Sequence, residues 1–343
     1  MSLIYHEIKD QYRAMEKCAR YLEEQYGALR ELVLKTNAPR TIFLGCGSSF
    51  SLAKSMADTV NIRLNHPAFA LPAGDAALHA RRYAKVADGA LIVPISRSGS
   101  TSEIFLALDA LRSNGCAFTV LSLSCVTDCR LSSYSALSLE MPWCFDESVC
   151  QTRTVSCLYY SAMYVIAKLA GDEALVRQLS EFPALGERFA SRYEKAWEAL
   201  AGGAWDHAVV LADAEIHGLA EEGALAFKEV CQLQSNCYHL LDVRHGPMVL
   251  IRDKTLVIAA LTDEKLELDL IGELKGHGAI IATVSDRSSP LEGTFNYVLG
   301  EDVDHIVRGL GVIALCQLVA FYKSKTTGTD PDHPTGLDAW IKL

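Results

Sequence analysis

The sequence predicts an α/β protein of two related lobes, each a parallel sheet flanked by helices, with a helix preceding the first lobe. Two observations indicate this fold class. Short apolar runs that end in Gly/Ser turns alternate with amphipathic stretches of helical period, which is typical of βα units. The same strand–helix–strand order restarts after about 165 residues, judged from apolar runs that begin at Thr41 and His207. We therefore expect three-layer αβα lobes of flavodoxin-like type.

The first half of the chain opens with apolar positions at helical spacing over residues 3–35, which predict a long helix suited to packing or dimerisation. A strand that begins at Thr41 and strands at 89–96 and 116–124 alternate with helical stretches, as in a parallel, helix-covered sheet. Two helical stretches occupy 150–200, and the second of them resembles a connector.

The second half repeats the pattern. Strands are predicted at 207–213, 255–263 and 277–286, with a helix after the first of them. A final apolar helix at 302–325 precedes a tail rich in Pro, Gly and Asp. We therefore divide the chain into three parts, which are an N-terminal helix (1–35), a first lobe (36–200) and a second lobe with the tail (201–343).

The charge balance excludes some classes of partner. The 343 residues carry 32 basic and 42 acidic side chains, giving a net charge of −10. The sequence contains no block of Lys and Arg residues. We therefore do not expect nucleic acid or an acidic membrane surface as a partner, whereas a small anion is still a candidate ligand. Half of the residues are apolar, enough for a sizeable core, and we expect no apolar run long enough to cross a bilayer.

The eleven cysteines form neither a CxxC pair nor a zinc-finger framework, so we expect reduced and mostly buried thiols. The N-terminal residues do not read as a secretory signal, and together these observations predict a cytoplasmic protein. No metal site is expected, because the spacings of one group of cysteines and histidines fit no familiar ligand set; the group is Cys125, Cys129, Cys144, Cys150, His66 and His79.

The first chemistry-bearing motif follows the strand that begins at Thr41. Backbone N–H groups at a helix N-terminus bind anions, and serine hydroxyls add donors; the turn consists of Cys46, Gly47, Ser48 and Ser49. Phe50 replaces the third glycine of a dinucleotide-binding turn, and no acidic residue follows before Asp75, so NAD is excluded; a P-loop signature is also lacking. The alternative is that the serines only cap the helix.

The second motif, at residues 96–103, occupies the same structural position after the next apolar strand. Ser100 and Glu103 have the spacing of a capping box, which explains part of the cluster. That box does not require the hydroxyls of Ser96, Ser98 and Thr101. Parallel strands place such turns at one edge of the sheet, so both loops are expected to converge on a phosphate or sugar hydroxyl. Arg97 either adds positive charge there or is a solvated surface residue.

The third motif combines a helix carboxylate, Glu229, with a histidine sixteen residues later, His245, in an Arg-His-Gly-Pro turn. A carboxylate and an imidazole on two sides of a small substrate suffice for acid–base chemistry. Considered alone, a helix carboxylate such as Glu229 is more often a surface or salt-bridged residue, and a histidine beside Gly-Pro is more often part of a turn.

Taken together, these motifs resemble the sugar isomerase (SIS) superfamily in its two-domain form. The resemblance is closest to the isomerase half of glucosamine-6-phosphate synthase, to ketosamine-6-phosphate deglycases and to phosphosugar isomerases. The matching segments occur in family order; they are FLGCGSS, Ser96–Thr101, Glu222–Leu225 leading to Lys228 and Glu229, Arg244–Pro247, and Gly328–Asp332.

The resemblance implies a role for each matching position. It identifies Cys46, Gly47, Ser48 and Ser49 as a substrate loop, Ser96, Arg97, Ser98 and Thr101 as a phosphate loop, and Val149 as a backbone contact to the sugar. It implies that Glu229 moves the proton between C1 and C2. It also implies that His245 opens the sugar ring in a neighbouring subunit, and hence a homodimer or dimer of dimers with shared active sites.

Departures from the family pattern narrow the expected activity. The synthase has lysines where this chain has Ala226 and Ala339, with Lys342 near the second, and a glutamine-hydrolysing domain is not expected here. We therefore expect a phosphosugar isomerase that acts on a hexose 6-phosphate or amino-sugar phosphate without a cofactor. Fructosamine 6-phosphate deglycase, amino-sugar phosphate deaminase and a non-catalytic phosphosugar-binding regulator remain alternatives. A deglycase would hold its amino acid's carboxylate through Arg97, Arg153 or Arg244.

Overall fold

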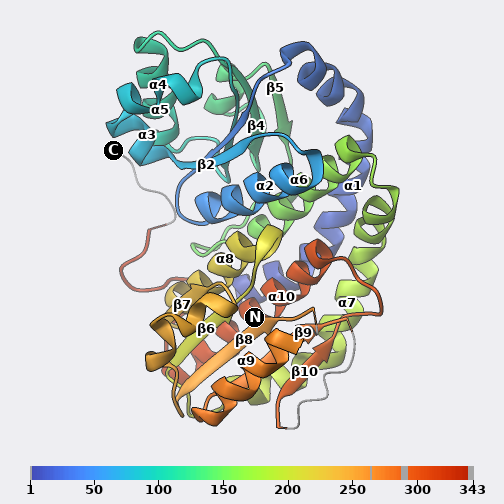
Figure 1. The fold of residues 1–343 in the computed structure, drawn as a ribbon, viewed down its shortest axis with the longest axis vertical. Coiled ribbons are helices and arrows are strands. Elements are labelled where there is room, and N and C mark those ends of the chain that lie inside the picture. Colours follow the sequence, from blue (N-terminus) through green and yellow to red (C-terminus); the bar gives the residue numbers. More distant parts are fainter. Residues whose placement is uncertain (1, 263–264, 287–292, 339–343) are drawn as a thin grey trace. The chain divides into compact units, whose positions relative to one another are not determined.

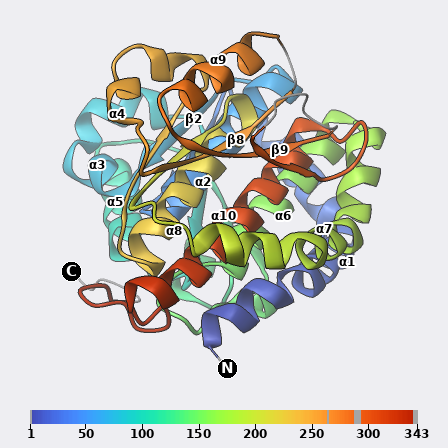
Figure 2. The same cartoon turned by 90° about the horizontal axis from the view of Figure 1, so that it is seen from below.

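The computed structural model describes residues 2–262, 265–286 and 293–338 and confirms the predicted α/β class. Two parallel five-stranded sheets are each flanked by helices (Figures 1 and 2). The chain packs as two compact units. The first, here the β1–β5 unit, consists mainly of Arg13–Glu147 and Arg153–Val176; the second, the β6–β10 unit, consists of Met1–Tyr12, Ser148–Thr152 and Arg177–Leu337.

The β1–β5 unit has the strand order β2-β1-β3-β4-β5, with all pairs parallel. Its strands are β1 (Thr41–Gly45), β2 (Ala68–Pro72), β3 (Leu91–Ser96), β4 (Thr119–Ser124) and β5 (Leu137–Glu140). Its helices are α2 (Ser48–Leu64), α3 (Ala73–Leu78), α4 (Ala80–Ala87), α5 (Ser102–Ser113) and α6 (Arg153–Ala170), with short 3-10 helices η1 (Arg130–Tyr134) and η2 (Pro142–Cys144). Helix α1 (Leu3–Thr36) is the predicted opening helix.

Side chains alternate between the two faces of this sheet, so each face buries its own set. Ile42, Leu44, Ile92 and Val120 form a core with α3, α4 and α5. The intervening residues, among them Phe43 and Val93, face residues of α1, α2 and α6 instead. Burial on both faces explains why the central strands are continuous apolar runs.

The β6–β10 unit has the strand order β10-β9-β8-β6-β7, which is the same topology as in the first sheet. Its strands are β6 (His207–Leu211), β7 (Gln234–Tyr238), β8 (Thr255–Ala260), β9 (Ile280–Ser285) and β10 (Phe295–Val298). Its helices are α7 (Glu173–Ala201), α8 (His217–Val230), α9 (Lys265–Gly276) and α10 (His305–Thr327), with 3-10 helices η3 (Ala214–Ile216), η4 (Leu241–Arg244) and η5 (Pro247–Leu250). The strand–helix–strand order restarts at the predicted spacing, since β6 begins 207 − 41 = 166 residues after β1.

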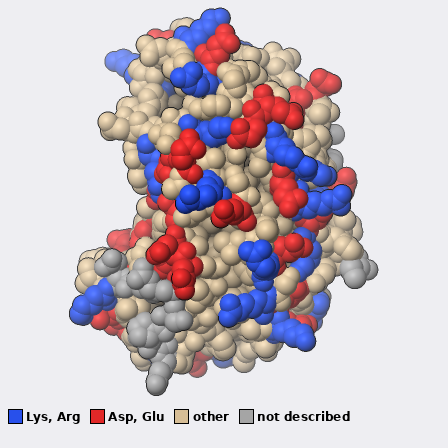
Figure 3. Space-filling model, turned by 90° about the vertical axis from the view of Figure 1, so that its right-hand side faces the viewer, with Lys and Arg blue, Asp and Glu red and all other residues tan. Residues whose placement is uncertain are grey.

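Helix α10 corrects one expectation, since it is long and apolar enough to span a membrane by length and composition. However, 94% of its most apolar window is buried within the protein, as in a core helix of a globular domain. Gly223 allows α8 to approach it closely, because a Cβ at that position would lie 2.9 Å from Sγ of Cys316. Acidic and basic side chains intermingle over the face drawn in Figure 3, in keeping with the mixed charge of the sequence.

The start of α1 is fixed by Asp332, from the Gly328–Asp332 motif. Its carboxylate accepts hydrogen bonds from the N–H groups of Leu3 (2.9 Å) and Ile4 (2.8 Å) and from the hydroxyl of Ser2 (2.8 Å). Partial burial raises the pKa of this carboxyl group, but the three hydrogen bonds outweigh that effect and hold the pKa below its usual value. The ionised carboxylate therefore caps the helix.

We predict that Asp332→Ala lowers the free energy of unfolding by about 1 kcal/mol at neutral pH, as for loss of a helix cap. Because the folded-state pKa is depressed, the stabilisation is present above about pH 4 and is lost as the pH falls through the folded pKa. Urea unfolding of wild type and variant at several pH values measures the difference. Glu301→Ala, at an exposed site, is the control. A difference that does not shrink in acid would contradict the capping role.

Candidate functional site

The two serine-rich loops follow β1 and β3, which are neighbouring strands paired in register from Thr41 and Leu91. The helix after β1 is α2, and the helix after β3 is α5, which packs on the opposite face of the sheet. In open α/β sheets, ligands bind at this switch point, outside the carboxyl ends of the strands. The structure thus brings both predicted loops to one edge of one sheet.

The first loop leads directly into α2. Ser48 and Ser49 are each 6% exposed, and α2 has no side-chain cap at its N-terminus, so the interpretation of these serines as cap residues is wrong. Cys46 is half-buried. Burial raises the pKa of its thiol to about 11, which keeps the sulfur neutral and makes it a weak nucleophile.

The second loop is held by its own hydroxyl groups. Oγ of Ser96 lies 2.9 Å from Oγ1 of Thr101 and accepts a hydrogen bond from the N–H of Gly99 at 3.0 Å. Gly99 has a φ of +61° and lies so close to Cys129 that a Cβ would be 2.2 Å from its Sγ. Only glycine fits this position. The loop is therefore tight and fixes the Ser96 and Thr101 hydroxyls side by side.

The neighbouring serines also bond within the loop. Oγ of Ser98 accepts a hydrogen bond from the N–H of Ser100 at 3.2 Å, and the Ser100 hydroxyl donates to the Ser98 carbonyl at 3.2 Å. Helix α5 begins at Ser102 with Thr101 before it and no side-chain cap. The Ser100–Glu103 spacing therefore does not form the predicted capping box.

Arg97 is only 6% exposed, so its interpretation as a solvated surface residue is wrong. Its carbonyl accepts a hydrogen bond from the N–H of Cys125 at 3.1 Å, and its guanidinium carbon lies 5.8 Å from the centre of the Phe145 ring. Arg97 lies at the end of β3, where little water screens its charge. Its electrostatic attraction for an anion is therefore stronger than that of an exposed arginine.

Val149 belongs to the short segment Ser148–Thr152 and is half-buried. The segment is anchored at both ends. The Ser148 N–H donates to Glu7 at 3.2 Å, and the Thr152 carbonyl accepts a hydrogen bond from the Gln317 amide at 3.0 Å. These bonds hold the backbone around Val149 in one conformation.

Glu229 and His245 are supplied by different elements of the β6–β10 unit. Glu229 is half-buried in the last turn of α8. His245 is exposed in the turn after η4, where its backbone N–H donates to the backbone carbonyl of Asp242 at 2.9 Å. Beside Glu229 on α8, Lys228 is exposed, whereas Ala226, at the position of a family lysine, is buried.

Two arginines considered for a carboxylate ligand have partners within the protein. Arg244 makes two hydrogen bonds of 2.9 Å to the carboxylate of Glu273. Arg153 lies 3.5 Å from the carboxylate of Asp146 and donates to the carbonyl of Phe145. Ala339 stands at the position of the second family lysine, and Lys342 is near it in the sequence. Both lie outside the described residues.

Sequence reasoning missed a pair of histidines at the carboxyl edge of the second sheet. The rings of His217 and His239 stack with centres 3.7 Å apart, after β6 and β7 respectively. Nδ1 of His217 lies 3.0 Å from the carbonyl of Ala212, and Nδ1 of His239 lies 2.9 Å from Asp213. Burial lowers the pKa of His217, which favours its neutral form. The only sequence signal was a histidine placed shortly after an apolar strand.

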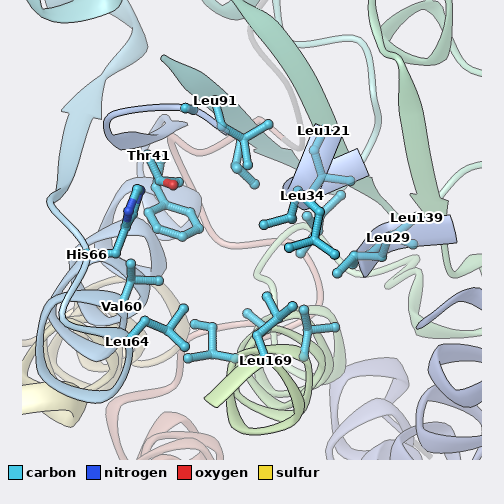
Figure 4. A pocket seen from close by; sticks show the side chains of 18 of the residues that line it. Leu29, Leu34, Thr41, Val60, Leu64, His66, Leu91, Leu121, Leu139 and Leu169 are labelled. Atoms are coloured by element: carbon cyan, nitrogen blue, oxygen red, sulfur yellow. The ribbon is translucent and has the colours of Figure 1, made fainter. Parts of the chain in front are cut away.

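An apolar cavity of about 260 Å³ lies elsewhere in the β1–β5 unit (Figure 4). Leu91, Leu121 and Leu34 line it, and Thr41 and His66 are among its few polar groups. Phe43, Val93 and Leu123 also line it, so the cavity lies between the sheet and the helices α1, α2 and α6, and no serine-loop residue is among its lining. Its lining is suited to apolar contacts and offers little for a phosphate.

Comparison with known proteins gives a domain match in the β1–β5 unit. Residues 36–166 match the SIS domain, and they span the β1–β5 sheet and both serine loops. The chain is 28% identical over 273 residues to glutamine–fructose-6-phosphate aminotransferase (isomerizing) of Yersinia pseudotuberculosis, covering 75% of this chain and 44% of that protein. The corresponding protein of Sulfurisphaera tokodaii is 25% identical over 309 residues, covering 88% of this chain and 49% of that protein. The chain thus spans about half the length of these relatives.

Solved structures extend the similarity to the whole chain. Glucosamine-6-phosphate deaminase from Thermotoga maritima is 25% identical, with a TM-score of 0.82 and 100% of both chains covered. Tagatose-6-phosphate ketose/aldose isomerase from Escherichia coli is 20% identical, with a TM-score of 0.85, and the similarity covers 98% of this chain and 97% of that chain. This similarity shows that the two proteins share a fold.

The serine loops at this switch point lie within the segment of the chain that matches the SIS domain. More particularly, this chain contains a SIS domain at residues 36–166 and is homologous to the isomerase domain of glutamine–fructose-6-phosphate aminotransferase.

Proposed function

We propose that this chain is an enzyme, a phosphosugar isomerase that acts on a hexose 6-phosphate or an amino-sugar phosphate. One observation carries the proposal, namely the two hydroxyl-rich loops that end the adjacent strands β1 and β3. Backbone N–H groups at a helix start together with fixed hydroxyls are the groups that bind a phosphate monoester. In this proposal Ser96, Ser98 and Thr101 hold the phosphate, with Arg97 supplying positive potential. Cys46, Gly47, Ser48, Ser49 and the backbone at Val149 contact the sugar.

The proposed reaction transfers a proton between neighbouring carbons and changes no oxidation state overall. His245 assists opening of the sugar ring by moving a proton between the ring oxygen and the C1 or C2 hydroxyl. The Glu229 carboxylate then removes the proton from C2 of the aldose and returns it to C1, while the hydroxyl proton on O2 passes to O1, which gives the ketose. Binding of the remote phosphate keeps these carbons in position for the transfer.

Deamination of an amino-sugar phosphate is the second candidate, and the 25% identity to the Thermotoga maritima deaminase over the full chain favours it. It uses the same ring opening and proton transfer, which gives an imine at C2; addition of water to this imine then forms the ketone and releases ammonia. A deglycase needs a cation for its amino acid's carboxylate, and Arg153 and Arg244 are engaged with Asp146 and Glu273. A phosphosugar-binding regulator would have no use for Glu229.

The decisive assay supplies fructose 6-phosphate, glucosamine 6-phosphate and a fructosyl-amino-acid 6-phosphate separately. It measures aldose, ammonia and free amino acid. Aldose from the first compound supports the isomerase, and ammonia from the second supports the deaminase. No turnover of any of the three would overturn the enzymatic proposal.

The phosphate loop is tested by Ser96→Ala. The variant removes the hydroxyl that bonds Thr101 and the Gly99 N–H, so we expect KM for the sugar phosphate to rise about tenfold or more, as for loss of one or two hydrogen bonds to a charged group. Ser100→Ala is the matched control, because Ser100 is exposed on the same loop. Equal KM values for wild type and the Ser96 variant would argue against a phosphate site there.

The proton-transfer role is tested by Glu229→Gln. The amide keeps the shape of the side chain but cannot accept the proton, so kcat falls at least about a hundredfold, the contribution of a general base. Phosphosugar binding, measured by calorimetry, stays nearly unchanged. Glu31→Gln, at an exposed carboxylate of α1, controls for loss of charge. Unchanged turnover in the Glu229 variant would remove it from the reaction.

The proposal also includes a homodimer in which His245 acts in the neighbouring subunit's site. Glu229→Gln and His245→Ala, each inactive alone, are therefore expected to recover activity when co-expressed. Random pairing makes half of the dimers mixed, and one of the two sites in a mixed dimer is intact, so recovery approaches about a quarter of wild-type activity. Mixed dimers that are isolated and inactive would show that each site takes both residues from one chain.

A further inference from the structure

The β1–β5 unit contains three cysteine thiols in mutual contact. Cys18 lies in α1, Cys144 ends η2 and Cys157 lies in α6. Their sulfur atoms all lie within 4.8 Å of one another, and Sγ of Cys18 is 3.3 Å from Sγ of Cys144. All three are fully buried. The proposed isomerase reaction uses none of them.

A polar group outside the cluster contacts one of its sulfur atoms. The indole N–H of Trp143 donates to Sγ of Cys18 at 3.3 Å. Such a hydrogen bond is compatible with a sulfur that has lost its proton to a bound cation, because the sulfur then acts only as an acceptor.

The spacing fits a small thiophilic cation. A d10 ion bonded to thiolates at about 2.3 Å, placed at the centre of three sulfurs, holds them about 4 Å apart. The observed sulfurs need to move only slightly to reach that arrangement. Structural zinc takes four ligands, whereas this group offers three among the described residues. A soft all-sulfur set with fewer than four ligands favours the monovalent copper ion.

We propose that Cys18, Cys144 and Cys157 form a binding site for one Cu(I) ion. Each sulfur that binds loses its S–H bond, its proton passes to solvent and an S–Cu bond forms. Neither the metal nor the sulfur changes oxidation state. The site is separate from the serine loops and adds a metal-dependent property to the protein.

The test titrates the reduced, full-length chain with Cu(I) in the absence of oxygen, supplied as its bicinchoninate complex, whose colour fades when the protein takes the ion. We expect one Cu(I) per chain and a thiolate-to-copper absorption band in the ultraviolet. The double variant Cys144→Ser/Cys157→Ser is expected to bind at least about a hundredfold more weakly, because loss of outer-shell partners alone costs up to that factor.

The matched control is Cys231→Ser, which removes a buried thiol whose Sγ donates to the Phe227 carbonyl. It is expected to bind copper like wild type. Failure of the wild type to compete with bicinchoninate, or equal binding by the double variant, would overturn the proposal.

A second measurement avoids any dependence on the folding of variants. X-ray absorption at the copper edge of the loaded wild type is expected to show a first shell of two or three sulfur atoms and no nitrogen or oxygen. A shell with nitrogen or oxygen would place the ion elsewhere. Displacement of the copper by an equal concentration of Zn(II) would also overturn the assignment to a monovalent ion.

Discussion

The position of the serine loops depends on the order of the strands. Because β1 lies between β2 and β3, the chain leaves β1 toward one face of the sheet and leaves β3 toward the other. The two connections diverge, so the loops that begin them lie at the point where ligands bind in open α/β sheets. The Gly99 contact with Cys129 and the Ser96–Thr101 hydrogen bond shape the second loop, and the first loop leads directly into α2. A loop of the same sequence after an edge strand would have a neighbouring loop on one side only.

The same strand order recurs in the β6–β10 unit with different side chains at the equivalent edge. There the loop after β6 carries Asp213 and leads to His217, which stacks on His239 from the end of β7. The loop after β6, which corresponds to the serine loop after β1, thus carries a carboxylate and leads to an imidazole. The two sheets have the same topology but different loops. The fold therefore provides an edge where loops meet, and the side chains of those loops determine the chemistry at that edge.

The sequence predicted the interior strands and missed the edges. Strands β1, β3, β4, β6, β8 and β9 fall within or begin the predicted apolar runs, because a strand buried on both faces is largely apolar along its whole length. The four strands without a prediction, β2, β5, β7 and β10, are the four edge strands of the two sheets, and each is half-exposed. Residues 18, 144 and 157 gave no signal as a cluster because only tertiary packing brings them together. The placement of Ser96 was predictable, since it needs only the parallel sheet, whereas the burial of Arg97 needed the packing around β3 and β4.

Burial of Arg97 has an energetic consequence for anion binding. Removing a guanidinium from water is unfavourable, and the protein compensates through interactions formed on folding rather than on binding. The loop beside it is already held by the Ser96, Ser98 and Ser100 hydrogen bonds. An anion that binds there meets fixed hydroxyls and a positive potential of low dielectric screening, so little binding energy is spent on ordering the loop. In the proposed reaction, the energy conserved in this way is available to hold the sugar carbons in position for proton transfer.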